Sequence, residues 1–355
     1  MARPDFFLLG APGPIGGANT EAWHTLIAWH AAGLRPAIIP TWQIDPEYRR
    51  KIDALGLPIV DARGPDDLAT IEHLAGSTVV SFCNQHLYRN LPALRGIRCR
   101  LVWVPCMTYL RRGERREFAQ HGPPDAIVYQ SHFQADEIHG AYTEMALCRG
   151  EPTPHRRIIR GAFDRREFPF VPRPHEPGRH FYIGRHSRPA LDKWHPDSLE
   201  IYGRTGVRYK RARLLGVDAA TRRHIGHRQQ FYPVDPIEPG GADPAEFLAT
   251  LHVFWPINNG ARENWPRAGL EAMAAGVPVL VPNAWGWPEM IDHGRTGLLW
   301  NDHAEAIRLA TELAKHEARR QELLHAARAA IENDPRFDPA ACAEAWRILL
   351  KDLAP

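Results

Sequence analysis

The stretch from Arg262 to Trp287 constrains the fold of this chain most, because its helix boundaries can be read directly from the residues. Pro266 suits the first position of a helix, where its missing N–H costs no hydrogen bond. Gly276, in the sequence Gly-Val-Pro, suits the end of a helix that cannot resume. We therefore predict a short helix from Pro266 to Ala275, and the apolar run 277–281 after it is typical of a buried parallel strand.

Two glutamates lie near the start of this helix, Glu263 in the preceding loop and Glu271 inside the helix. At about 1.5 Å per helical residue, their carboxylates are expected to lie about 10 Å apart. That separation is too large for the nucleophile and acid of a retaining glycosidase, which lie roughly 5 Å apart. It suits two carboxylates that hold the two ends of an elongated ligand, with an anion bound at the helix N-terminus between them. A nucleoside diphosphate sugar is such a ligand.

This stretch resembles the E-x7-E signature of retaining glycosyltransferases of family 4, which have the GT-B fold. The resemblance rests on Glu263, on Glu271 and on the sequence Glu-Ala-Met-Ala-Ala-Gly-Val-Pro-Val that begins at Glu271. It implies that Glu263 faces the hydroxyls of the donor sugar and that Glu271 holds the ribose of the nucleotide. The family has a small glycine turn where this chain has Trp265 and Pro266. The further donor-binding residues implied in this stretch are Asn264, Trp265, Pro266 and Arg267.

The first half of the chain alternates short apolar runs with helical patterns, which predicts a doubly wound parallel sheet. Its first apolar run leads into a glycine-rich loop with Gly16 and Gly17, and a helix follows. Such glycines let the backbone approach a ligand, and the helix N-terminus favours phosphate. The loop resembles the Gly-Gly loop of the same family, which implies that Gly16 and Gly17 bind the donor. The predicted strands are Phe6–Leu9, Ala37–Ile39, Leu57–Val60, Thr78–Phe82, Leu101–Val104, Ala126–Tyr129 and Arg157–Ile159.

His86 is the candidate for a catalytic histidine. It follows the predicted strand Thr78–Phe82, and the family commonly brings a histidine from the first domain towards the donor sugar. A structural, hydrogen-bonded histidine is the alternative, and it stays open in a chain with 19 histidines.

The second half opens with Gly184-Arg185-His186-Ser187-Arg188, followed by Lys193. This resembles the Gly-Arg sequence and downstream lysine of the family, and it implies that Arg185 and Lys193 hold the donor diphosphate. Arg188 competes with Lys193 for that role. A guanidinium and an ammonium can neutralise a leaving phosphate without a metal. The resemblance therefore implies neither a cofactor nor a metal site, with the nucleoside diphosphate sugar as a substrate.

The chain has 355 residues, which is too long for one typical domain. A proline-rich stretch before residue 179 reads as a semi-rigid linker. We predict an N-terminal Rossmann-like, acceptor-side domain over 1–168 and a C-terminal Rossmann-like, donor-binding domain over 179–333. The resemblance adds a last helix, 334–355, that returns to the first domain. The expected fold is thus α/β and of the GT-B type, with two doubly wound domains facing each other across a cleft.

The composition indicates the cellular compartment and limits the kinds of partner that this chain can have. Five cysteines without C-x-x-C spacing argue against a disulfide framework and a zinc site. Apolar runs are too short for a membrane span and the first residues do not read as a signal peptide, so we expect a cytoplasmic protein, at most peripheral to the inner face of the membrane. The net charge of +3 does not by itself imply nucleic acid. Basic clusters at 111–116 and 204–213 read as solvated faces, with an anionic acceptor, a membrane surface or a phosphate backbone as alternatives.

These observations predict a retaining, metal-independent glycosyltransferase that moves a hexose from a nucleoside diphosphate sugar, with UDP as the expected nucleotide. The acceptor stays open among a glycan, a lipid-linked glycan, a natural product, a protein and a modified nucleic acid. Two alternatives are a GT-B sugar-nucleotide epimerase and a non-catalytic, nucleotide-sugar-binding partner of a glycan synthase. The loop Asn283–Pro288, with Trp285 and Trp287, is expected either to wall the ligand or to belong to the core.

Overall fold

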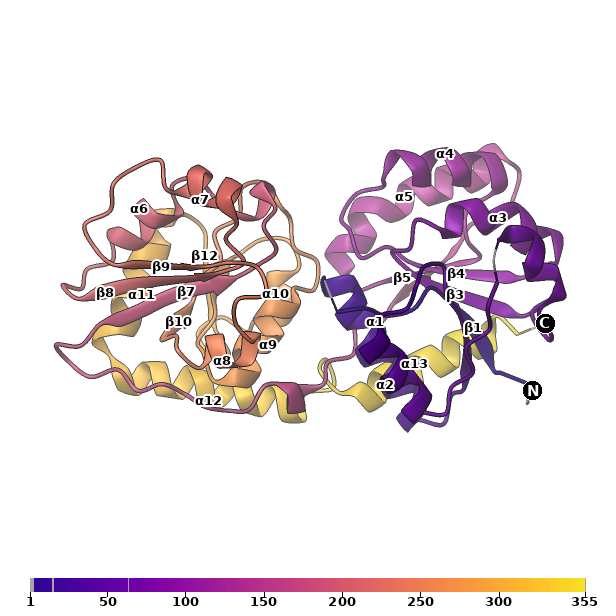
Figure 1. The fold of residues 1–355 in the computed structure, drawn as a ribbon. Helices are drawn as coiled ribbons and strands as arrows, with labels where there is room; N and C mark the ends of the chain where they lie inside the picture. The colour runs from indigo at the N-terminus through magenta and orange to yellow at the C-terminus, as the bar shows by residue number, and fades with distance from the viewer. Residues whose placement is uncertain (1–2, 15, 63, 355) are drawn as a thin grey trace. The chain divides into compact units, whose positions relative to one another are not determined.

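The computed structural model describes residues 3–14, 16–62 and 64–354, which form two compact α/β units (Figure 1). The first unit combines Met1–Phe163 with Asp338–Pro355, and the second is Asp164–Phe337. The chain therefore leaves the first unit once and returns to it only after the second unit is complete.

The first unit is built on a six-stranded parallel sheet in the order β2-β1-β3-β4-β5-β6. The order reverses between β1 and β3, as in doubly wound folds. The predicted strand Leu57–Val60 contributes only an isolated bridge, between Ile59 and Ile38 beside β2. The strands are β1 Phe6–Leu9, β2 Pro36–Ile39, β3 Thr78–Phe82, β4 Arg100–Val104, β5 Ala126–Tyr129 and β6 His155–Ile158.

Helices cover both faces of this sheet because its central strands are apolar on both faces. Along β1, Phe6 and Leu8 pack into one core, and Phe7 and Leu9 pack into the other. In Figure 1, α3, α4 and α5 lie above the strands, and α1, α2 and α13 lie below. The helices are α1 Gly17–Ala31, α2 Pro46–Ala54, α3 Leu87–Gly96, α4 Arg112–His121, α5 His132–Cys148 and α13 Pro339–Asp352, with short 3-10 turns η1 Pro65–Thr70 and, in the second unit, η2 Arg165–Glu167.

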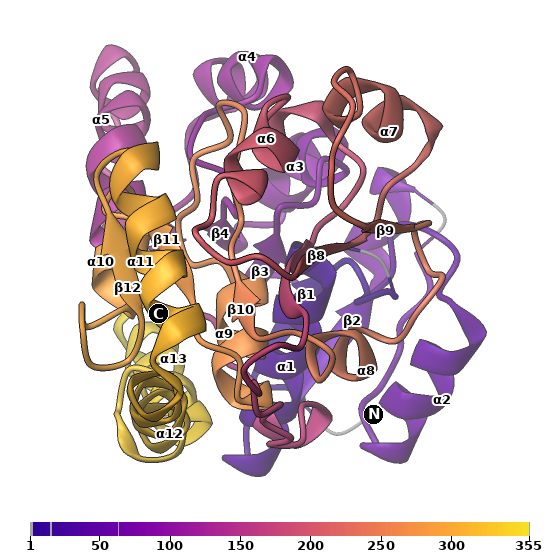
Figure 2. The ribbon, with the colours of Figure 1, turned by 90° about the vertical axis from the view of Figure 1, so that its left-hand side faces the viewer.

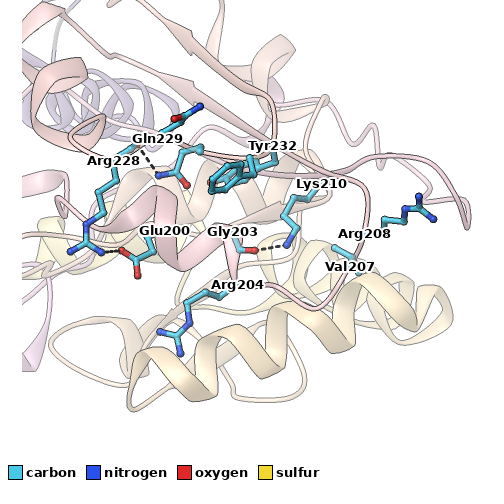
Figure 3. A pocket seen from close by; sticks show the side chains of 11 residues that line it. Glu200, Gly203, Arg204, Val207, Arg208, Lys210, Arg228, Gln229 and Tyr232 are labelled. Carbon is cyan, nitrogen blue, oxygen red and sulfur yellow. Dashed lines mark hydrogen bonds and ion pairs between the residues drawn. The ribbon is translucent and has the colours of Figure 1, made fainter.

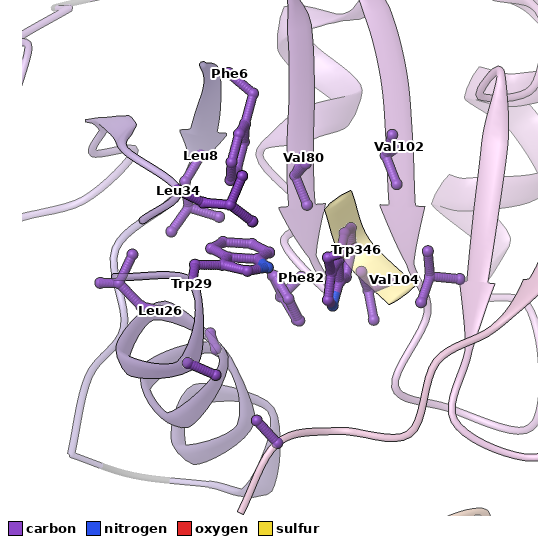
Figure 4. Close-up of a cluster of buried hydrophobic side chains, with 14 of the residues drawn as sticks. Phe6, Leu8, Leu26, Trp29, Leu34, Val80, Phe82, Val102, Val104 and Trp346 are labelled. Atoms are coloured by element: carbon purple, nitrogen blue, oxygen red, sulfur yellow. The ribbon is translucent and has the colours of Figure 1, made fainter. Parts of the chain in front are cut away.

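The last helix completes the lower core of the first unit (Figure 4). Trp346 of α13 meets Trp29 of α1 edge-on, with ring centroids 5.0 Å apart, and lies 5.9 Å from the ring of Phe82 on β3. All three rings are buried. Aromatic rings of this size dominate the energetics of a core, so α13 is an integral part of the first unit.

The second unit repeats the same plan. Four parallel strands lie in the order β10-β7-β8-β9, and a bridge between Phe254 and Val279 places the parallel pair β11-β12 beyond β10. The order therefore reverses between β7 and β10. Figure 2 shows α6 and α7 above β8 and β9, and α8 and α9 below them. The elements are β7 Phe181–His186, η3 Leu191–Lys193, α6 Ser198–Gly203, β8 Lys210–Leu215, α7 Ala219–Ile225, β9 Val234–Ile237, α8 Pro244–Leu248, β10 Val253–Phe254, α9 Arg267–Ala275, β11 Leu280–Pro282, α10 Trp287–Met290, β12 Leu298–Trp300, α11 His303–Lys315 and α12 Glu317–Asn333.

The proline-rich segment predicted as a linker is instead packed on the second unit. Val171 N donates to Ala275 O at 3.2 Å, at the end of α9. The ring of Phe170 lies against Gly276, and the guanidinium carbon of Arg328 on α12 is 5.7 Å from that ring. A proline-rich segment lacks the N–H donors that a sheet requires, but it can still pack in an extended form against the surface of a domain. The segment 169–178 therefore belongs to the second unit, whose boundaries fall at Asp164 and Phe337.

Candidate functional site

The predicted donor residues gather where the strand order of the second sheet reverses. β7 ends at His186, and the loop after the adjacent strand β10 carries Glu263 and leads into α9. In open α/β sheets, ligands bind outside the carboxyl ends of the strands at this switch point. The site described here lies wholly within the second unit.

The carboxylate of Glu263 is held by two donors. Lys193 Nζ lies 2.6 Å from Glu263 Oε1, and Asn258 Nδ2 donates to the same oxygen at 3.0 Å. Burial alone raises the pKa of Glu263, but Lys193, Asn258 and Arg185 outweigh it and bring the pKa below its ordinary value. Glu263 is thus a fixed, ionised carboxylate. Among the described residues, none donates a hydrogen bond to its second oxygen, Oε2.

Arg185 lies beneath this loop and is only 2% exposed. Its Nη1 donates to Ile257 O at 2.8 Å, its Nη2 donates to Asn258 Oδ1 at 3.2 Å, and its guanidinium carbon lies 4.6 Å from the centre of the Trp194 ring. Arg185 fixes Asn258, which in turn fixes Glu263. The structure therefore gives Arg185 a positioning role towards Asn258, and the diphosphate contact that the resemblance implied stays a prediction.

Lys193 and Arg188 lie on the loop that follows β7. Arg188 is exposed, and its carbonyl accepts a hydrogen bond from the buried indole of Trp194 at 3.0 Å. Lys193 closes the 3-10 turn η3, with its N–H donating to Ala190 O at 2.8 Å. The loop thus places one cation against Glu263 and a second cation in solvent. Both remain candidates for contact with a diphosphate.

Glu271 is paired with a histidine. His186 Nε2 lies 3.1 Å from Glu271 Oε2, and the two side chains are 11% and 12% exposed. Burial raises the pKa of Glu271 to about 7, a shift that Arg267 opposes and Glu167 reinforces. Burial, with a contribution from Arg185, lowers the pKa of His186 to about 4. Near neutral pH the imidazole is therefore uncharged, so the contact is a close approach of two buried groups rather than an ion pair.

The predicted helix from Pro266 to Ala275 is confirmed to within one residue, since α9 spans Arg267–Ala275. Pro266 is the residue before α9, and Gly276 ends the helix in the left-handed conformation with φ 83°. Trp265 is 3% exposed and stacks on Phe337 with ring centroids 5.7 Å apart. Asn264 and Arg267 are each 8% exposed. The tryptophan that replaces the family's glycine turn is therefore part of the core of this unit.

A close backbone contact fixes the loop that carries Glu263. Gly286 N donates to Glu263 O at 2.8 Å, and a Cβ on Gly286 would lie 1.5 Å from Asn264 O, so only glycine fits. Its neighbour Trp285 adopts φ 61° and is half-buried, whereas Trp287 is 2% exposed and packs on α9. Of the two tryptophans, Trp287 belongs to the core.

Asn258 and His186 were not predicted as site residues from the sequence. His186 stands directly after the Gly-Arg sequence, at the end of β7, which was a local signal that it borders the site. Asn258 follows the end of β10 at Phe254 by four residues. Polar residues just beyond the carboxyl ends of two adjacent parallel strands are expected to meet.

The remaining predicted residues lie in the first unit, at the carboxyl ends of its strands. Gly16 has φ 95° and precedes α1, which begins at Gly17, and both glycines are exposed. His86 precedes α3, and its Nδ1 lies 2.7 Å from Thr41 O. Because a carbonyl only accepts, Nδ1 carries the proton in the neutral ring and Nε2 is the acceptor. The ring also meets that of Trp42 edge-on at 5.8 Å.

Comparisons with known proteins bear on both units. The family model described as glycosyl transferases group 1 matches residues 241–333, which include Glu263 and Glu271. No curated protein matches the sequence. Among solved structures, Anabaena Alr3699/HepE in complex with UDP-glucose has a TM-score of 0.71 and 16% identity, covering 98% of this chain and 99% of that one. A glycosyltransferase from Rickettsia africae has a TM-score of 0.72 and 12% identity, covering 99% of both chains.

Sucrose-phosphate synthase from Thermosynechococcus elongatus is similar over the same extent, with a TM-score of 0.64, 13% identity and 99% of both chains covered. At such identities a likeness establishes the fold. The chain has the GT-B fold with two Rossmann-like domains, as the sequence predicted.

Proposed function

We propose that this chain is a glycosyltransferase that moves a hexose from a nucleoside diphosphate sugar to an acceptor, with retention at the anomeric carbon and without a metal. One observation carries the proposal: the two glutamates of the E-x7-E spacing border the switch point of the second sheet, with Glu263 held by Lys193 and Asn258, and Glu271 beside His186. Burial raises the pKa of Glu271 to about 7, whereas the cations and amide around Glu263 outweigh its burial and bring its pKa below the ordinary value. The family-model match over 241–333 and the shared fold support an enzyme of this class.

Glu263 would hold the donor sugar. Lys193 and Asn258 both occupy Oε1, so Oε2 accepts from a sugar hydroxyl in a fixed direction. A carboxylate held by two donors loses little freedom when a ligand binds, which favours binding of one geometry. The negative charge also stabilises the positive charge that develops at the anomeric carbon as the bond to phosphate breaks.

The leaving diphosphate would lie between Glu263 and Glu271, near the N-terminus of α9. A helix N-terminus favours an anion, and Lys193 and the exposed Arg188 add positive charge beside it. In the mechanism that the family resemblance implies, a phosphate oxygen takes the proton of the acceptor hydroxyl on the face from which the diphosphate leaves. The sugar carbon to phosphate oxygen bond breaks, the acceptor oxygen forms the new bond, and the configuration is retained.

Glu271 would bind the ribose. A carboxyl group with a pKa of about 7 can accept a hydrogen bond from a ribose hydroxyl when it is ionised. His186 beside it is uncharged near neutral pH. UDP is the nucleotide to test first, because the Anabaena protein has been solved with UDP-glucose and with UDP. The Staphylococcus aureus TarM variant has likewise been solved with UDP.

The proposal is tested by measuring binding and slow hydrolysis of UDP-, GDP-, ADP- and TDP-glucose by the wild type and by Glu263→Gln and Glu271→Gln. Glu271→Gln is expected to weaken UDP and UDP-glucose alike, because it acts on the nucleotide. Glu263→Gln is expected to spare UDP and to slow hydrolysis of the sugar nucleotide. Activity is expected to survive EDTA, and the product anomer, read by NMR, is expected to match the donor.

Two results would refute the proposal. If no nucleotide sugar binds, α9 and its glutamates are only structural. If a sugar nucleotide binds equally well to the wild type and both variants, the ligand lies elsewhere on the chain. Binding without any cleavage, with or without an acceptor, would favour a non-catalytic partner over an enzyme.

A further inference from the structure

A pocket of about 440 Å³ lies at the end of the second sheet opposite the site just described. It is formed by the end of α6, the start of β8 and the segment 228–232 (Figure 3). Lys210, which lines the pocket, lies opposite Phe181 in the register of β8 with β7, at the beginning of β7. His186, which borders the candidate site, is at the other end of β7. We name the surface formed by Arg204, Arg208, Arg228 and Phe231 around this pocket the Phe231 face.

Phe231 is the most conspicuous apolar group of this surface. Its side chain is 96% exposed, more than any other exposed large apolar residue in the described part of the chain. Tyr209, which precedes the pocket-lining Lys210 in sequence, is 43% exposed, and the guanidinium carbon of Arg208 lies 5.4 Å from the centre of its ring. Neither ring contributes to the core of the unit. An aromatic ring kept in water forgoes the gain from burial, which a second surface would restore.

The Phe231 face is also basic, and its charges are not all neutralised within the protein. Lys210 Nζ donates to the carbonyls of Gly203 and Thr205 and so closes the end of α6. Arg228 is paired with Glu200. Arg204 and Arg208 form no ion pair with any described residue, and Figure 3 shows their side chains extending outward and away from each other. The arginines therefore border the pocket rather than fill it.

We propose that the Phe231 face docks on a lipid bilayer that carries anionic headgroups, with Phe231 inserted at the interface and the arginines among the headgroups. Aromatic rings flanked by basic residues suit the boundary between acyl chains and headgroups, and each basic residue near an anionic leaflet adds attraction. No helix in the described ranges is long and apolar enough to cross a membrane, so this attachment would be peripheral. The proposal does not depend on the proposed function.

A bilayer fits this surface better than a single-stranded nucleic acid does. Nucleic acid binding combines a basic groove with several rings on which successive bases stack. Here one ring, that of Phe231, is almost fully exposed, and the pocket that it lines is bordered by arginines whose side chains extend outward (Figure 3). A bilayer requires only an apolar side chain at that position, and stacking requires an aromatic ring. Replacement of Phe231 by leucine therefore separates the two partners.

The test is co-sedimentation of the full chain with vesicles of phosphatidylcholine alone and of phosphatidylcholine mixed with phosphatidylglycerol. Wild type is expected to bind the anionic vesicles more tightly, and added salt is expected to weaken that binding. Phe231→Ala is expected to lower the partition coefficient about tenfold. Arg204→Gln with Arg208→Gln is expected to lower it about fivefold per arginine. Phe231→Leu is expected to bind like the wild type.

Matched controls lie on the first unit. Leu147→Ala removes an exposed leucine, 65% exposed, and Arg112→Gln with Arg115→Gln removes two exposed arginines from the other basic cluster. Both are expected to bind vesicles like the wild type. The proposal is overturned if wild type ignores anionic vesicles, or if the controls lower binding as much as the Phe231 face variants do. Loss of binding in Phe231→Leu, together with ring-dependent binding of a single-stranded oligonucleotide, would indicate nucleic acid instead.

Discussion

Replacing Glu271 by glutamine should make the protein more stable at high pH while removing the proposed ribose contact. The carboxyl of Glu271 is 12% exposed and lies 3.1 Å from His186. Glutamine keeps the shape of the side chain and can donate a hydrogen bond to His186 Nε2. It removes the cost of ionising a buried carboxyl group beside a neutral partner.

The magnitude follows from the pKa. Burial raises the pKa of Glu271 from 4.5 to about 7, so the folded state holds this proton more tightly than the unfolded state does. Stability is therefore lost as the pH rises from about 4.5, and the loss levels off above about 7. The full difference corresponds to at most about 3 kcal/mol, of which about 1 kcal/mol is already lost at about pH 5. Glu271→Gln should thus gain about 2 kcal/mol more over the wild type at about pH 8.5 than at about pH 5.

Hydrogen exchange of peptides from β7 and α9 measures this, because it reports opening of the second unit alone, whereas a single global transition need not. Exchange rates are corrected for their intrinsic pH dependence at both pH values. Glu322→Gln is the control, since that side chain is 66% exposed and should give the same result at both. An equal effect of Glu271→Gln at the two pH values, or a loss of stability at the higher one, would show that burial does not govern Glu271.

Two further substitutions test how Glu263 is held. Asn258→Ala removes the hydrogen bond to Glu263 Oε1, which is charge-assisted and contributes about 1.5–3 kcal/mol, so donor hydrolysis should slow by about 10- to 100-fold while UDP binding, measured by calorimetry, is kept. Gly286→Ala places a methyl group 1.5 Å from Asn264 O and must displace the loop, so it should abolish donor hydrolysis. Gly140→Ala, where a Cβ meets nothing within 4 Å and φ is not positive, should not. Normal hydrolysis by Gly286→Ala would mean that the Glu263 loop need not be held in place.

Local signals predicted much of the donor-side helix. Pro266 and Gly276 bound α9 because each acts on the backbone at its own position, without help from distant residues. The doubly wound sheet of the first unit was likewise predicted from apolar runs, since central parallel strands are buried on both faces. Leu57–Val60 has the same composition but lies beyond the edge strand β2, where it forms only one bridge.

The contacts between side chains inside the site could not be predicted from local sequence signals. His186 and Glu271 are 85 positions apart, and their contact depends on how β7 and α9 pack. The burial of Arg185 could have been predicted from the sequence, because every second residue of a strand points to the same face. Arg185 shares the buried face of β7 with Phe181 and Ile183. The family motif indicates that an arginine is expected at this position, but the alternation of side chains along β7 determines which face of the sheet that arginine lies on.

The return of α13 to the first unit also sets the order in which this protein can be completed during synthesis. When Phe337 leaves the ribosome, every residue of the second unit has been made, but the first unit still lacks Trp346. Until then Trp29 and Phe82 line an unfinished apolar face. The second unit is therefore the first to have all of its residues available for folding, although it comes later in the chain.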